Sequence, residues 1–573
     1  MAHGKREYKR AIPERVANYI PRVIVKFRDN DNSAMTPDET ARIQKDEIKR
    51  YESIERNPEQ YLGPSWNRFV EQYRGLTIQK LITSVTPQQI IKLREKARQP
   101  DGTYRPANFL TYFAVRCPSV EVAQKVAETL QDHELWPTVE GAYVEGGPAL
   151  PPAVTLSPNE SASQHHLDPS LANGGDPGGI DARYAWTISG GDGDVGSTQV
   201  GLQFVDMEWG WVLDHEDLPT IPAPISVDPV MIPGDNDSDY QGHGTAVLGI
   251  VVAVNNNSKP CVGIAPQVKT TKVVSPWVWN GTTWTYSVAN AIFAALSLPL
   301  HPGDVLLLEV QTRHNSSIGF GYPVEIYQAE FEAIKTATQA DISVIEAAGN
   351  AGDDLDNLVA NDWTMMSNGV VNAIQFSLNL RNANFQDSGA IMVGAALMAS
   401  AAEVASAASA SPPVIVIPRS RRENYGTRID CYAWDNNIST TGYDDDLGLS
   451  PGEDPTTSYF GFSGTSGASA IIAGAVLAIQ GIAQVHVKGD LANHRFSPIQ
   501  LRSILRDPRT GTLSANSMWN TGFNSTWDPD PMNNPDFSKW NADRIGAMPD
   551  LSKIITDTLD VVPPMAPTGL TVR

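Results

Sequence analysis

The chain has 573 residues and a formal net charge of −22 at pH 7, from 43 Lys and Arg against 65 Asp and Glu. The first 100 residues carry a net charge of +7, and the remaining 473 carry −29. With 41% hydrophobic residues, the chain can bury a large core, which excludes a disordered polyelectrolyte. The acidic body also argues against nucleic acid as a partner, because phosphate binding requires clustered Lys and Arg.

Three features bear on the location of the protein. No run of about 18 consecutive apolar residues is present, so we expect no membrane partner. No apolar stretch with a small-residue cleavage site follows the charged start, so no secretory signal is visible and the compartment is left open. The three cysteines form no CxxC or Cys/His pattern, and we expect buried thiols at Cys117, Cys261 and Cys431.

Residues 1–145 are predicted to form a small α+β domain. Apolar periodicity and helix-start signals favour alternating strands and helices here. The expected elements are a strand at Arg22–Phe27, a charged, helix-prone insertion at 29–71, a helix at 86–98, a strand at 109–115, a helix at 119–130 and a strand at 141–145.

A Gly- and Pro-rich stretch at 146–179 is predicted to be a linker. Over 180–560, apolar strand-like runs alternate with helical segments, which is typical of a doubly wound parallel sheet with covering helices. The last residues, 561–573, are similar to the opening strand of a fibronectin type III module, and on that interpretation the natural chain continues past Arg573.

Three motifs contain the residues of a possible hydrolytic site. Asp206 ends a buried-strand pattern, His243 lies in GHGT at the start of a small-residue helix, and Ser466 lies in SGTSGAS at a Gly-bounded turn before an Ala-rich helix. Peptide hydrolysis needs a nucleophile, a base near neutral pKa and an anion that orients the base, and Ser, His and Asp supply these roles. A Ser at a helix start also has backbone amides available to an oxyanion.

The chain resembles the subtilisin-like serine proteases, or subtilases. The order Asp, His, Ser is theirs, and the segments GIAP, AAGN and NYGTRIDCYA occur in family order between the motifs. The resemblance implies Asp206 as the orienting carboxylate, His243 as the general base, Ser466 as the acylated nucleophile and Asn350 as the oxyanion donor. No cofactor is needed for this chemistry.

The sequence departs from the family pattern around these residues. The family has Asp-Ser/Thr-Gly at the acid, whereas this chain has Asp206-Met207-Glu208. Gly467 follows the nucleophile where Met is usual. The substrate-binding positions implied by the resemblance are Glu309, Val310, Gln311 and Gly349. Glu309 predicts a weak preference for Arg or Lys at the cleaved position, with a Glu held by internal hydrogen bonds as the alternative.

The resemblance also implies a possible structural calcium site. Subtilases often bind calcium where an Asn-rich loop after the His helix meets the Asp of an HxDL segment, and the matching residues are Asp217, Asn256 and Asn257. Oxygen ligands of this kind suit calcium. A solvated turn is the alternative.

The N-terminal domain resembles, in its element order and in its AYVE ending, the propeptide of secreted subtilases. This resemblance implies that the N-terminal domain inhibits the rest of the chain and that the chain cleaves itself between Glu145 and Gln164. It also favours a secreted protein. An unrelated regulatory domain is the alternative. The opposite net charges of the two parts would strengthen their encounter and make it depend on salt.

We therefore expect a monomeric serine endopeptidase acting on peptides or proteins and made as a zymogen. Two alternatives stay open. One is a peptide ligase or macrocyclase on the same fold, and the other is a catalytically silent binding scaffold. A sedolisin-type acid peptidase shares the SGTS turn but lacks the GHGT histidine.

Overall fold

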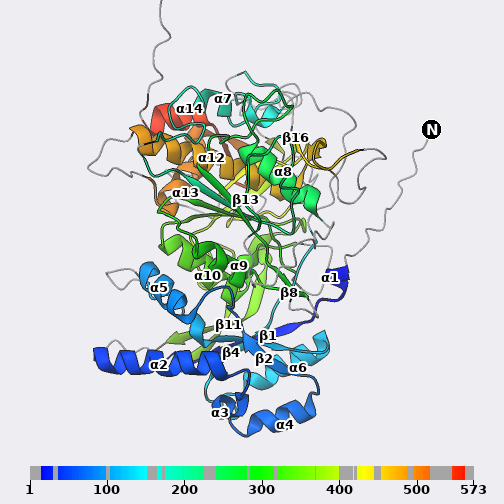
Figure 1. Ribbon diagram of the computed structural model, residues 1–573, viewed down its shortest axis with the longest axis vertical. Coiled ribbons are helices and arrows are strands. Elements are labelled where there is room, and N and C mark those ends of the chain that lie inside the picture. Colours follow the sequence, from blue (N-terminus) through cyan, green and yellow to red (C-terminus); the bar gives the residue numbers. More distant parts are fainter. Residues whose placement is uncertain are drawn as a thin grey trace, which may run out of the picture.

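The computed structural model describes residues 14–29, 36–98, 104–150, 164–170, 174–197, 199–224, 240–279, 284–314, 321–367, 370–398, 417–418, 423–443, 453–486, 495–515, 545–559 and 561. Most of the segment 513–543 and all of 561–573 except Val561 lie outside these residues. The described part is an α/β body with a smaller α+β unit beside it (Figure 1).

The body is built on a nine-stranded, mostly parallel sheet. Its order is β14-β18-β19-β15-β13-β10-β9-β5-β6. The strands are β5 (Gln203–Met207), β6 (Thr270–Val274), β9 (Val305–Leu308), β10 (Ser343–Ala347), β13 (Ile391–Ala396), β14 (Ile417–Pro418), β15 (Cys431–Trp434), β18 (Gly511–Ala515) and β19 (Ala547–Pro549). β5 pairs in parallel with β6 on one side and β9 on the other, so the winding direction reverses at β5. Ligands of open α/β sheets bind at the carboxyl ends of the strands beside such a reversal.

Helices cover both faces of this sheet, as the sequence predicted. One face carries α8 (Gln241–Val252), α12 (Gly464–His486) and α13 (Pro498–Arg506), and the other carries α9 (Val288–Leu296) and α10 (Gln328–Gln339) (Figure 1). Side chains alternate across the sheet, since Phe204 packs in the first core and Val205 in the second. The second core continues without a break into the N-terminal unit.

By length and composition alone, helix α12 could cross a membrane. The helix has 23 residues, and its apolar stretch has a mean hydropathy of 1.8. However, 94% of this stretch is buried inside the protein. Its burial identifies it as the central core helix of the body. The predicted buried thiols are confirmed, and burial raises the pKa of Cys117 and Cys261 to about 12.

The N-terminal unit has its own antiparallel sheet, in the order β2-β3-β1-β4. The strands are β1 (Arg22–Phe27), β2 (Thr77–Lys80), β3 (Tyr112–Arg116) and β4 (Val139–Val144), and the helices are α1 (Glu14–Ala17), α2 (Pro37–Ser53), α3 (Pro58–Leu62), α4 (Ser65–Gln72), α5 (Pro87–Ala97) and α6 (Val120–Leu130). Thr36 and Thr86 form capping boxes with a following Pro, which start α2 and α5. The sequence did not predict β2, and it began β3 too early because Phe109–Thr111 forms a 3-10 turn.

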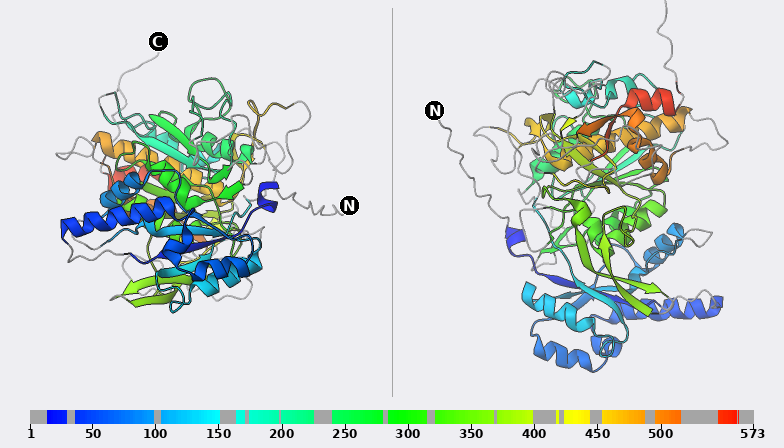
Figure 2. Two further views of the ribbon diagram at one scale, coloured as in Figure 1. Left: turned by 60° about the horizontal axis from the view of Figure 1, so that its bottom comes forward. Right: turned by 180° about the vertical axis from the view of Figure 1, so that it is seen from behind.

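A long hairpin from the body reaches the N-terminal unit. It consists of β11 (Val359–Ser367) and β12 (Val370–Ser377), was not predicted, and contacts β4 (Figure 2). Trp363 and Phe376 stack with ring centroids 4.0 Å apart, which fixes the base of the hairpin. The remaining short elements are α7 (Ala182–Ala185), α14 (Leu551–Lys553), β7 (Trp277–Trp279), β8 (Trp284–Tyr286), β16 (Ile438–Thr441) and β17 (Tyr459–Phe462).

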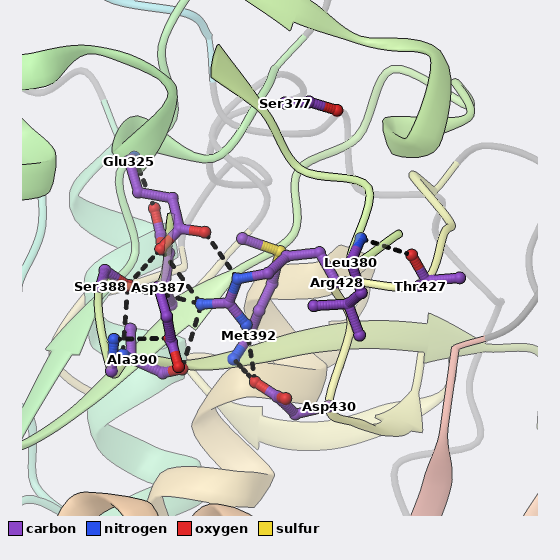
Figure 3. Close-up of polar contacts among 12 residues, drawn as sticks. Glu325, Ser377, Leu380, Asp387, Ser388, Ala390, Met392, Thr427, Arg428 and Asp430 are labelled. Atoms are coloured by element: carbon purple, nitrogen blue, oxygen red, sulfur yellow. Dashed lines mark hydrogen bonds and ion pairs between the residues drawn. The ribbon is translucent and has the colours of Figure 1, made fainter. Parts of the chain in front are cut away.

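The NYGTRIDCYA motif supplies a buried ion network rather than a catalytic group. Arg428 binds Glu325 through Nε at 2.7 Å and Asp430 through Nη1 at 2.8 Å, and Ser388 also contacts Glu325 (Figure 3). These charges hold the 3-10 turn before α10 and the start of β15 together. Removing one partner would leave an uncompensated buried charge, at a cost of about 3–5 kcal/mol.

Candidate active site

The polar residues singled out in the sequence lie near the carboxyl ends of β5, β9 and β10. His243 is in the first turn of α8, Ser466 is in the first turn of α12, and Asn350 follows β10. Helix α8 packs closely against the loop after β5, because a Cβ on Gly244 would lie 2.2 Å from the Gly210 carbonyl oxygen. Only Gly at position 244 allows this approach, which brings His243 to the loop that carries Glu208.

The imidazole of His243 is bound by Glu208. Its Nδ1 makes a short hydrogen bond to Glu208 Oε1, and both side chains are buried. Glu208 Oε2 accepts from the Trp209 backbone N–H at 2.7 Å, which fixes the carboxylate. The edge of Phe462 packs on the other side of the ring, with centroids 4.8 Å apart. A histidine held in this way presents Nε2 as the basic nitrogen.

Asp206 does not hold the histidine, contrary to the interpretation of the sequence. It lies inside β5, and its Oδ2 accepts from the indole Nε1 of Trp211 at 2.7 Å. The sequence contained a signal for Glu208, since Glu208-Trp209-Gly210 keeps the Gly of the family's Asp-Ser/Thr-Gly pattern in its place. Residue type favours Asp206 and the spacing to Gly210 favours Glu208, and the longer Glu side chain occupies the position expected of Asp.

Two buried carboxyl groups beside this site, Asp206 and Glu309, have raised pKa values. Burial raises the pKa of Asp206 well above its usual range, the charge of Glu208 raises it further, and Trp211 opposes the shift. Burial and the charge of Glu208 likewise raise the pKa of Glu309. Burial thus favours the neutral forms of Asp206 and Glu309, and Glu208 is the carboxyl group that contacts the imidazole.

The turn before Ser466 is fixed by backbone hydrogen bonds. Gly464 has a φ of 86° and donates its N–H to Asp435, so the turn needs a residue without a Cβ. A Cβ on Gly467 would lie 2.4 Å from Ile438 Cδ1, although the chain's own Gly fits. A larger side chain at position 467 would therefore require the end of the Ile438 side chain to shift.

Asn350 lies directly beside this turn. Its Oδ1 accepts from the backbone N–H of Thr465 at 3.0 Å, and its Nδ2 donates to Gln311 Oε1 at 3.0 Å. An amide nitrogen carries two protons, so one remains for another acceptor. The arrangement can present this N–H together with the backbone N–H groups of the first turn of α12 that follow Thr465.

The comparisons with known proteins place this geometry in a family. Residues 225–509 match the model of the subtilase family, a span that includes His243 and Ser466 and begins after Glu208. The chain contains a domain of the subtilase family. It therefore has the fold of a serine protease, as the sequence predicted. No curated protein sequence matches the chain.

The subtilase chain is similar to several solved structures at low sequence identity. The epidermin leader peptide processing serine protease of Staphylococcus aureus is 14% identical, with 94% of this chain and 99% of that chain covered and a TM-score of 0.45. Fervidolysin from Fervidobacterium pennivorans is also 14% identical, with 83% and 60% covered and a TM-score of 0.44. A cold adapted subtilisin-like serine proteinase is 16% identical, with 58% and 95% covered and a TM-score of 0.34.

The expected substrate wall of this subtilase differs from its prediction. Glu309 is only 2% exposed and is bound by Ser469, and Val310 is buried too. This placement matches the alternative of a Glu held by internal hydrogen bonds, and the preference for Arg or Lys stays an untested prediction. The side chain of Gln311 accepts a hydrogen bond from Asn350. Gly349 packs closely on the backbone, because a Cβ at this position would lie 2.3 Å from the Gly321 carbonyl oxygen.

The residues of the expected calcium site satisfy one another without a cation. Asp217 Oδ1 accepts from Asn257 Nδ2 at 2.7 Å, and its Oδ2 accepts from the Cys261 backbone N–H at 3.0 Å. Asn256 takes a left-handed turn conformation with a φ of 62°. Both carboxylate oxygens are therefore occupied by N–H donors, which does not fit a calcium ligand set.

We expect the subtilase to show no calcium dependence at this site. EDTA should leave the melting temperature unchanged to within about 1 °C, since one structural ion of even modest affinity would contribute about 2–3 kcal/mol of stability when saturated. Differential scanning calorimetry with and without added calcium measures this. A drop of several degrees that calcium reverses would contradict the fit described for Asp217.

We also expect Asn350→Ala to lower kcat by about 10²–10³-fold with little change in KM, because an oxyanion donor acts mainly in the transition state. Steady-state hydrolysis of a chromogenic peptide measures both constants. Asn357→Ala serves as the control, since Asn357 lies on a nearby turn and bonds only to Asp354 through its side chain. Equal effects of the two substitutions would remove Asn350 from the oxyanion site.

Proposed function

We propose that this subtilase is a serine endopeptidase whose triad is Ser466, His243 and Glu208. The observation that carries the proposal is the buried hydrogen bond between His243 Nδ1 and Glu208, next to the first turn of α12. Both catalytic helices meet here, since α8 and α12 pack on each other on the same face of the sheet. No comparable contact of His243 with Asp206 is found among the described residues.

The roles follow from the chemistry of acyl transfer. Ser466 Oγ attacks the scissile carbonyl, and His243 Nε2 takes the hydroxyl proton as the carbon–oxygen bond forms. Glu208 stabilises the resulting imidazolium and keeps Nδ1 protonated. The imidazolium then gives its proton to the leaving amine, and a water molecule activated by His243 hydrolyses the acyl-enzyme.

The oxyanion is stabilised by groups that are already in place. The backbone N–H groups of the first turn of α12 point out of the helix start, and the second proton of Asn350 Nδ2 is directed by its hydrogen bond to Gln311. These donors need little rearrangement as negative charge develops on the carbonyl oxygen.

Labelling with a biotinylated fluorophosphonate tests this proposal. Wild type should gain one label on Ser466, found by peptide mass mapping, whereas Ser466→Ala and His243→Ala should gain none on the same time scale. A protein that folds but remains unlabelled would support the silent-scaffold alternative. Transpeptidised instead of hydrolysed peptide product would identify the ligase alternative.

We also propose that the N-terminal unit is a self-inhibiting propeptide. The segment after β4 lies antiparallel to the strand extension after β9, where Ala149 N–H donates to Gln311 O at 3.3 Å and Arg313 N–H donates to Gly147 O at 3.2 Å. Pro148 pairs with Thr312 in the same ladder. A peptide substrate adds to an exposed sheet edge in the same way, so residues 146–150 have the pairing of a bound peptide.

Close packing fixes the path of this tail. A Cβ on Gly146 would lie 2.3 Å from the Tyr327 ring, so only Gly fits at this position. Arg22 binds Glu145 at the end of β4 and also donates to the Tyr286 carbonyl oxygen at 2.8 Å. One arginine therefore ties the end of the propeptide to the body.

The propeptide forms hydrogen bonds with the first turns of α9 and α10, the helices on the second face of the nine-stranded sheet. The Ala329 N–H, at the start of α10, donates to the Tyr143 hydroxyl at 2.9 Å. At the start of α9, Asn290 Oδ1 accepts from the backbone N–H groups of Thr83 and Ser84, both at 2.9 Å. These bonds and the shared apolar core support a docked inhibitor. The salt dependence of this docking stays a prediction from net charge.

A further inference from the structure

Glu309 lies beside the nucleophile but has no role in the triad. It follows β9, is 2% exposed, and its Oε1 makes a short hydrogen bond with Ser469 Oγ. The Ser466 side chain also interacts with the Glu309 carboxyl group. Ser469 and Ser466 belong to the first turns of α12, so Glu309 joins the end of β9 to the segment that holds the nucleophile.

A count of protons at Ser469 indicates the form of Glu309. Ser469 Oγ is within hydrogen-bond distance of three acceptors, namely Glu309 Oε1, the Thr465 carbonyl oxygen at 2.7 Å and the Ser466 carbonyl oxygen at 3.1 Å. A serine hydroxyl has one proton to donate. If it donates to the Thr465 carbonyl within the helix, the contact with Glu309 requires a proton on the carboxyl group.

We propose that Glu309 is a positioning residue that acts in its acid form, donating its proton to Ser469 and so fixing the turn that carries Ser466. This inference rests on the proposed protease function. The chain runs from Glu309 O–H to Ser469 Oγ and from Ser469 O–H to the Thr465 carbonyl oxygen. A carboxylate at position 309 would break this order and place a negative charge near the developing oxyanion.

The surroundings of Glu309 favour the acid form. The titratable groups that face it are Asp206 in β5 and Glu208 in the following loop, while α12 contributes only hydroxyl groups. His243, on α8, directs its Nδ1 to Glu208. Burial and the Glu208 charge both raise the pKa of Glu309, and only the two serine hydroxyls oppose them prominently. Activity should therefore be present below this pKa and lost as the pH rises through it.

Two substitutions at Glu309 test the proposal. Glu309→Gln keeps a donor for Ser469 and an acceptor for Ser466, so kcat should stay within about threefold of wild type at pH 7. Glu309→Leu removes the donor and should lower kcat about tenfold or more at nearly constant KM, because the substrate contacts are unchanged. The alkaline decline of wild-type activity that follows ionisation of Glu309 should be absent in Glu309→Gln.

Ser469→Ala removes the acceptor of the proposed hydrogen bond. It should lower kcat as Glu309→Leu does, and the double variant should be no worse than either single one. Glu346→Gln is the matched control, since Glu346 is a buried carboxyl that accepts from the Glu325 backbone N–H in the ion network. It should leave kcat and the pH profile unchanged.

Two results would overturn the inference. A Glu309→Gln variant that folds but loses activity as severely as Glu309→Leu would show that the site needs a carboxylate. Additive losses in the double variant would show that Glu309 and Ser469 act separately. Either result leaves the protease proposal intact as long as wild type labels with fluorophosphonate, whereas wild type that neither labels nor hydrolyses peptides would refute the proposed function itself.

Discussion

Glu208→Gln is expected to lower kcat of peptide hydrolysis by about 10⁴-fold while leaving KM nearly unchanged. A triad acid replaced by its amide has this effect because the imidazole is held in the wrong tautomer and its cationic form loses its counter-charge. The buried contact of Glu208 Oε1 with His243 Nδ1 places it in that role. Steady-state kinetics with a chromogenic peptide measure the change.

Asp206→Asn is the matched control for this prediction. Asp206 is buried two residues away on the same segment and accepts a hydrogen bond from Trp211, which an amide oxygen can also accept. Its loss should change kcat by less than about tenfold, because the neutral acid does not contact the histidine. If Asp206→Asn were the more damaging substitution, the assignment of Glu208 would be wrong.

Wild type is expected to cut itself, and Ser466→Ala is expected to remain at its full mass of 62.1 kDa. Loss of the nucleophile lowers catalysis by about 10⁶-fold, so no cleavage should occur during purification. Residues 146–150 pair with the body as a peptide substrate would, and Gln164 is bound to Val262 by two hydrogen bonds. The bond that is cut should therefore follow Leu150 and precede Gln164.

Intact-mass spectrometry after timed incubation measures this cleavage. The two fragments should stay associated in gel filtration, because the apolar core shared by α9, α10 and the N-terminal sheet is not broken by the cut. Asn357→Ala again serves as a cleaving control. Cleavage of Ser466→Ala at the same place and rate would show that another protease makes the cut.

Much of the fold and part of the site were predictable from local patterns. Pro after a capping Thr marked α2 and α5, and apolar runs marked β1, β9 and β10. The sequence placed His243 at the start of a helix and Ser466 at a Gly-bounded turn before another helix, and α8, α12 and the positive φ of Gly464 confirm both placements. These features depend on residues that are near one another in the sequence, so they can be predicted without knowledge of the fold.

The parts that the sequence missed depend on contacts between distant segments. Nothing local shows that Glu309 turns inward to Ser469, because that contact joins residues 160 positions apart. The choice between Asp206 and Glu208 depends on how α8 approaches the loop after β5. The β11–β12 hairpin is an exception, because Asn368-Gly369 between its strands is a local hairpin signal that was overlooked. Its register is set partly by Trp363 packing on Phe376.

Proton NMR of the His243 Nδ1–H resonance tests the central claim most directly, which is that Glu208 holds the catalytic base. The experiment uses the uncleaved Ser466→Ala protein labelled with ¹⁵N-histidine, alone and combined with Asp206→Asn or Glu208→Gln. A short hydrogen bond to a carboxylate should give a strongly deshielded Nδ1–H signal in the parent, kept in Asp206→Asn and lost in Glu208→Gln. A signal lost in Asp206→Asn and kept in Glu208→Gln would contradict the account.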